Sequence, residues 1–127
     1  PAKYINNGDV IVIATGTGVV LIGELFKSND CRLVLKCPAV VQIRPTVKDG
    51  KQSSQIMLGL LTPDAITENK SRFTAVPFNI IFDVEKASSS IVDTYKDFAK
   101  QVDEQLFHKN MNEEELKAQE NFYENMM

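Results

Sequence analysis

Short apolar segments separated by turn residues fill residues 9–85, and apolar residues at helical spacing follow them. In the first part, β-branched and other apolar residues alternate with polar ones or form short runs, which is typical of strands. The segments that we predict as strands are 9–14, 19–26, 32–36 resuming at 40–44, 55–61 and 72–85. Pro38 interrupts the third strand, and Pro77 splits the last or places part of it at a sheet edge. Residues 45–54 are polar and contain an Asp-Gly pair, which predicts a loop with a turn.

The glycines at positions 16, 18 and 23 allow two interpretations, a phosphate-binding loop and a bent sheet. Gly16 and Gly18 are one residue apart, but a dinucleotide-binding loop needs a third glycine three residues later and a helix after it. An apolar strand follows instead, and no Gly-Lys-Ser/Thr sequence completes a Walker loop. We therefore predict a hairpin turn at residues 15–18 and strand bends at Gly23 and Gly59.

Beyond residue 87 the pattern changes to that of helices. Ser90 with Asp93 resembles a capping box at the start of the first helix. A second helix is predicted after Asn112, with Glu115 three residues later and few apolar positions. Apolar residues spaced by four, three, four and four define the buried face of the first helix: Ile91, Tyr95, Phe98, Val102 and Leu106.

The length of 127 residues fits one domain, and 43% hydrophobic residues are enough for a core and too many for a disordered chain. The fold class that we predict is mostly β. Five strands in residues 1–87 form a small bent barrel, and residues 88–127 form a helical extension that packs on it or projects from it.

The net charge of −3 argues against a general nucleic-acid coat. It is uneven, because residues 1–87 carry ten Lys/Arg against eight Asp/Glu, and residues 88–127 carry four against nine.

Candidate catalytic and metal-binding groups are few. His108 is the only histidine and lies near a helix end, so no Ser-His-Asp or His-Cys arrangement is supported. Cys31 and Cys37 are six residues apart, which favours buried free thiols over a zinc site or a disulfide framework. The acidic residues Asp93, Asp97, Asp103 and Glu104 are interpreted as a solvated helix surface. We therefore expect no enzyme, no metal and no cofactor.

The chain has no apolar run of about 20 residues that would span a bilayer, and its first residues do not resemble a secretory signal. With only two cysteines, a reducing compartment is favoured. The expected location is the cytoplasm, without membrane contact.

One segment resembles the first sequence motif of Sm and Sm-like proteins. The family's pattern is a turn glycine, an apolar strand, a Gly-x-Leu step, a short polar loop and an alternating strand. The corresponding residues are Gly18, Val20, Gly23-Glu24-Leu25, Lys27 to Asp30 and Arg32-Leu33-Val34-Leu35. The resemblance covers residues 9–44, and the whole arrangement is also similar to small uncharacterised Sm-like proteins of tailed marine phages, which end in a helix.

This resemblance implies a five-stranded barrel whose open edges pair head to tail into a homo-oligomeric ring. For a phage protein it implies an accessory role in the host cytoplasm. The family's second motif, with its Ile/Val-Arg-Gly step, is absent, and its nearest equivalent is 75–77. The positions of the family's RNA-binding Asp and Asn fall on Ser28 and Arg32, so the usual uridine pocket is not expected.

Two functional hypotheses follow. The favoured one is a non-enzymatic structural or protein-interaction module, whose partners are copies of itself and another protein. The alternative is a ring that binds single-stranded RNA or DNA through loops that face its pore, where each copy adds to a small basic patch. The candidate nucleic-acid-binding residues are Lys27, Asn29, Arg32, Lys36 and Arg72, which are otherwise ordinary surface groups.

Overall fold

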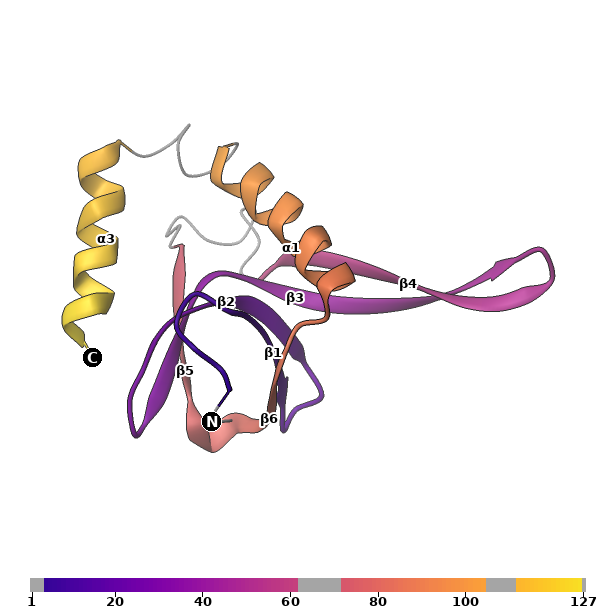
Figure 1. The fold of residues 1–127 in the computed structure, drawn as a ribbon, viewed down its shortest axis with the longest axis horizontal. Helices are drawn as coiled ribbons and strands as arrows, with labels where there is room; N and C mark the ends of the chain where they lie inside the picture. The colour runs from indigo at the N-terminus through magenta and orange to yellow at the C-terminus, as the bar shows by residue number, and fades with distance from the viewer. Residues whose placement is uncertain (1–3, 62–71, 105–111, 127) are drawn as a thin grey trace.

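One antiparallel sheet of six strands dominates the computed structural model, which describes residues 4–61, 72–104 and 112–126 (Figure 1). A 3₁₀ turn, η2 (Phe78–Ile80), joins β5 to β6, and two helices follow, α1 (Ser89–Val102) and α3 (Glu113–Met126). The sheet order is β4-β3-β2-β1-β6, with β5 also paired to β3. The predicted class, mostly β with C-terminal helices, is confirmed. The strands are β1 (Val10–Thr15), β2 (Val20–Ser28), β3 (Arg32–Lys48), β4 (Lys51–Leu60), β5 (Phe73–Pro77) and β6 (Ile81–Lys86).

β3 is one continuous strand that a bulge divides between two partners. Residues 32–36 pair with β5, and residues 39–48 pair with β4. Between them, Cys37 and Pro38 lie opposite the single Gly23 of β2, and Cys37 has a φ of 50°. Such a bulge bends a strand and increases its twist. The bend predicted at Gly23 is confirmed, whereas Pro38 lies in the bulge and does not end the strand.

The loop predicted at residues 45–54 is wrong, because these residues extend β3 and β4 into a long hairpin. Its turn is Asp49-Gly50, where both φ angles are positive, 54° and 75°, as the tight two-residue hairpin turn requires. β3 and β4 keep one register past Gly59, so no bulge lies at this glycine, unlike at Gly23. Residues 42–57, which we call the arm, project beyond α1 (Figure 1). Their polar composition suggested a loop because no core lies beneath them.

The last predicted strand is split at Pro77, as expected, into β5 and β6. β6 pairs with β1, but Ala14 lies opposite Asp83 and Thr15 opposite Ile81, so Phe82 is an extra, bulged residue. Among the described strands, β5 pairs only with β3 and β6 only with β1. The sheet is therefore open, and closure into a barrel stays a prediction.

Apolar side chains form two clusters in the sheet region. The first cluster contains Ile11, Ile13, Leu21, Leu25, Leu33, Leu35 and Val76. The second contains Val10, Ile22, Ala39 and Tyr95, and includes further residues of α1, among them Ile91, Val92, Phe98 and Ala99. The helical face predicted for α1 is thus confirmed for Ile91, Tyr95 and Phe98, and Val102 is half-buried. The predicted positions Leu106 and His108 lie outside the described residues.

Both helices begin near their predicted positions, but only one has its predicted cap. α1 starts at Ser89 with Ser88 as its N-cap, so Ser90 lies inside the helix and the capping box predicted with Asp93 is wrong. At α3, the Glu115 backbone N–H donates a hydrogen bond of 2.9 Å to the Asn112 side-chain oxygen, as an N-cap residue does. Neither helix in the described ranges combines the length and apolarity needed to cross a membrane.

Candidate functional site

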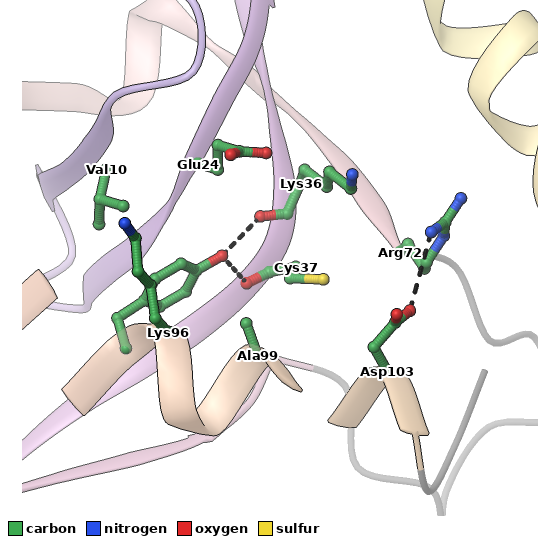
Figure 2. A pocket seen from close by; sticks show the side chains of 9 residues that line it. Val10, Glu24, Lys36, Cys37, Arg72, Lys96, Ala99 and Asp103 are labelled. Atoms are coloured by element: carbon green, nitrogen blue, oxygen red, sulfur yellow. Dashed lines mark hydrogen bonds and ion pairs between the residues drawn. The ribbon is translucent and has the colours of Figure 1, made fainter. Parts of the chain in front are cut away.

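A cavity of about 220 Å³ lies between α1 and the bulge of β3 (Figure 2). The bulge turns the backbone carbonyls of Lys36 and Cys37 toward the helix. α1 supplies Tyr95, and Asp103 follows as the C-cap residue of this helix. Charges of both signs surround the cavity, so it is not a simple anion or cation site. Its lining residues are Val10, Glu24, Lys36, Cys37, Arg72, Tyr95, Lys96, Ala99 and Asp103.

Tyr95 anchors α1 to the bulge. Its side chain is 3% exposed, and its hydroxyl lies 2.8 Å from the carbonyl oxygens of both Lys36 and Cys37, to which it donates. Burial raises the pKa of this hydroxyl well above its ordinary value, so it stays protonated at neutral pH. Tyr95 is therefore a structural donor to the backbone carbonyls of the bulge.

Arg72 and Asp103 form an ion pair at one side of the cavity, with 3.7 Å between Arg72 Nη1 and Asp103 Oδ1. The two side chains are 11% and 31% exposed. Arg72 Nη2 also donates to the Leu116 carbonyl of α3 at 3.4 Å, and its guanidinium lies 5.7 Å from the centre of the Phe73 ring. The interpretation of Asp103 as a solvated acid is thus wrong, because a cation from outside the helix pairs with it.

The Cys37 thiol is poorly suited to nucleophilic chemistry. Burial, and then the nearby Asp103, raises its pKa to about 11, which keeps it in the unreactive protonated form at neutral pH. Cys37 is half-buried, but Cys31 is exposed, so the expectation of two buried thiols is wrong for Cys31. Within the described ranges, no three His, Cys, Asp or Glu side chains are grouped to hold a metal ion.

The five candidate nucleic-acid-binding residues do not share one free surface. Lys27 pairs with Glu124 of α3 at 3.3 Å, and Arg32 Nη1 lies 3.9 Å from the Met126 sulfur. The Asn29 side-chain oxygen accepts hydrogen bonds from the backbone N–H groups of Cys31 and Arg32, at 2.8 and 3.0 Å, so it shapes the turn. Lys36 and Arg72 line the cavity instead.

Helix α3 lies over part of this region. The Arg72 backbone N–H donates to Gln119 at 3.3 Å, and the rings of Phe73 and Tyr123 have centroids 5.2 Å apart. These contacts, with those of Lys27 and Arg32, mean that the basic groups around the loop between β2 and β3 are engaged by the chain's own C-terminal helix.

The sheet border at β6 has a different character. Phe82, the bulged residue, is 83% exposed, and neighbouring Ile80 is 44% exposed. An apolar cavity of about 270 Å³ is lined by Ile81 and Val84 of the same strand, with Leu33 and Phe78. The sequence did not predict the exposure of Phe82, because the pattern of apolar and polar residues gives no sign of a bulge within this strand. The one sign in the sequence is that two large apolar residues, Ile81 and Phe82, are adjacent, whereas a regular strand would point them to opposite faces.

No protein-family model matches the chain, and no curated protein matches its sequence.

Proposed function

We propose that the chain is a non-enzymatic Sm-like module that assembles with copies of itself, and that β5 of one copy pairs with β6 of the next. In this proposal the small bent barrel is completed by neighbouring copies, and head-to-tail pairing through a constant rotation closes a ring. The ring would serve as a structural or protein-interaction platform. A phage accessory role belongs to the same hypothesis and rests on the family resemblance alone.

The exposed Phe82 at an unpaired sheet border is the observation that supports this proposal most. Large apolar side chains with 83% exposure are costly at a border that water alone covers. Bulges at sheet edges commonly re-aim one side chain. The unpaired borders of β5 and β6 belong to consecutive strands joined by η2, so one copy offers two edges to two neighbours.

Nucleic-acid binding is the weaker hypothesis. Lys27 and Arg72 form ion pairs with Glu124 and Asp103, so a phosphate would have to compete with carboxylates of the same chain. Asn29 has its side-chain oxygen in a turn. The basic patch that several copies would multiply is therefore partly neutralised.

Light scattering on the full chain at micromolar concentration tests the proposal. We expect a mass of several chains for the unchanged protein and a lower mass for Phe82→Glu, because a carboxylate beside Asp83 repels an incoming strand and removes apolar contact area. Val19→Ser is the matched control, since Val19 is 43% exposed but lies in the turn between β1 and β2. A monomeric unchanged chain, or an unaltered mass for Phe82→Glu, contradicts the proposal.

A further inference from the structure

The cavity between α1 and the bulge of β3 has no part in the proposed assembly, although charged side chains line it. Glu24 of β2 and Lys36 of β3 lie directly opposite each other, and both border the cavity. Lys96 of α1 is a third charged group of the lining. Within the described part of the chain, no ion pair involves any of these three side chains (Figure 2). The cavity therefore brings together a carboxylate and two ammonium groups that the protein itself does not pair.

Arg72, also in the lining, lacks a complete set of acceptors. Its ion pair with Asp103 is long, at 3.7 Å, and its buried Nε has no hydrogen-bond acceptor among the residues that the structure describes. A buried N–H without an acceptor costs stability. A small rotation of the side chain would let a carboxylate that enters the cavity supply the acceptor.

The charged groups of the lining lie around one part of the cavity. Burial has the largest effect on the pKa of the Cys37 thiol, which it raises, and four charged side chains also act on it. In decreasing order of effect these are Asp103, Lys36, Arg72 and Glu24. Because a charge shifts a pKa through space only at short range, these groups all lie near the thiol. A ligand beside Cys37 would thus meet both positive and negative groups.

The remaining lining is apolar and the space is small. Val10 and Ala99 border the cavity together with Tyr95. The volume of about 220 Å³ lies below the range of about 300–1,000 Å³ that is usual for drug-sized ligands. A molecule of about eight non-hydrogen atoms, with charged groups at one end and an apolar group at the other, matches this size and lining.

We propose that the cavity binds an α-amino acid with a short apolar side chain, such as valine. The ligand carboxylate lies toward Lys36 and Arg72, and its ammonium group toward Glu24. Its apolar side chain lies against Val10 and Ala99. A simple anion is less suited because Glu24 repels it, and a simple amine because Lys36 and Arg72 repel it. This proposal does not depend on self-association.

Saturation-transfer difference NMR on the full chain tests the proposal, because the measurement works for a monomer and for a large assembly. Three probes are compared: valine, 3-methylbutanoate, which lacks the ammonium group, and 2-methylpropylamine, which lacks the carboxylate. We expect a saturable signal from valine with a Kd of about 1 mM or lower, and binding of both analogues that is weaker by about fivefold or more. No saturable signal from valine, or equal binding of either analogue, would overturn the proposal.

Substitutions then locate the ligand. Lys36→Met should weaken the binding of valine by about tenfold, because the carboxylate loses a charged donor. Glu24→Gln should weaken the binding of valine and leave that of 3-methylbutanoate unchanged or stronger. Lys100→Met is the control, since Lys100 is exposed on α1 and does not line the cavity. Circular dichroism checks that each variant is folded. If Lys100→Met weakens binding as much as Lys36→Met does, valine binds elsewhere and the proposal is wrong.

The Phe82→Glu chain separates this binding from self-association. Phe82 does not line the cavity, so this variant should bind valine with an unchanged Kd, whatever its mass. An unaltered mass with normal valine binding contradicts only the edge-pairing proposal. A loss of valine binding that accompanies a lower mass would show that one chain does not complete the cavity, which contradicts the binding site described above.

Discussion

The hydroxyl of Tyr95 lies 2.8 Å from the carbonyl oxygen of Cys37, the residue at which β3 changes its pairing partner from β5 to β4. One side chain of α1 thereby fixes the helix to the bend of the sheet. The bend in turn sets where the arm leaves the body. The position of the arm thus depends on a contact between residues far apart in the sequence.

The substitution Tyr95→Phe removes this hydrogen bond and keeps the ring in the second cluster. We expect the free energy of unfolding to fall by about 1–2 kcal/mol, because the buried carbonyl groups of the bulge lose their donor. Urea unfolding measures the change. Tyr4→Phe is the control, since the Tyr4 hydroxyl bonds to Glu85 at an exposed site and its loss should have a smaller effect. Equal effects of the two substitutions would contradict the anchoring role.

The Cys37 thiol makes stability depend on pH in the alkaline range. Burial raises its pKa from 9.0 to about 11 in the folded chain, so between these values the unfolded chain loses a proton that the folded chain keeps. The free energy of unfolding should therefore fall as pH rises from about 9 to about 11, by up to about 2–3 kcal/mol, with no contribution from this thiol below pH 8.

Urea unfolding at several pH values, compared between the unchanged chain and Cys37→Ala, isolates this contribution from that of Tyr95. The difference in stability between the two chains should shrink as pH rises. Cys31→Ala is the matched control because Cys31 is exposed. A difference that is constant from pH 8 to 11 would show that the thiol is not buried as described.

The order of the strands and helices was predictable from the sequence because most of them are amphipathic or apolar. β1 and β2 are short apolar strands buried along much of their length, α1 buries one face, and turns mark the ends of the strands. The outer arm was not predictable, because no core imposes alternation on residues 45–54. The sequence also carried no sign of the register shifts between strands, so the bulges at Phe82 and Cys37 were not predicted. Ion pairs such as Arg72 with Asp103 join distant segments, and spacing along the chain carries no information about them.

Gly23 and Gly59 are a further example of what the sequence could not predict. Both are glycines inside apolar strands, but their surroundings in the structure differ. A Cβ at Gly23 would lie 3.1 to 3.4 Å from three side-chain atoms of Leu35, which is fully buried. Gly23→Ala should lower the free energy of unfolding by about 1–3 kcal/mol through overpacking. At Gly59 no atom of the described residues, apart from the two chain neighbours, lies within 4 Å of the added carbon. Gly59→Ala should be neutral or stabilise by about 0.4–1 kcal/mol. Thermal or urea unfolding of both variants checks this, and similar losses at the two sites would contradict the bulge geometry.

Arg72 is the candidate nucleic-acid-binding residue whose role the structure changes most. Arg72→Ala removes the ion pair with Asp103 and the hydrogen bond to the Leu116 carbonyl, so we expect a loss of about 1–2 kcal/mol in stability. Amide hydrogen exchange should rise in residues 113–126, because α3 loses a contact. Lys27→Ala should cost less than about 0.5 kcal/mol, since its pair with Glu124 is exposed.

Gel shift with short single-stranded RNA and DNA at about 50 mM salt completes the comparison, because binding through phosphates is strongest at low salt. If Arg72 and Lys27 serve to dock α3, neither substitution should weaken any retention of nucleic acid. A salt-dependent complex with the unchanged chain that both substitutions abolish, without a change in exchange of α3, would instead support the nucleic-acid hypothesis. The two readouts therefore assign these cations either to a ligand or to the chain's own C-terminal helix.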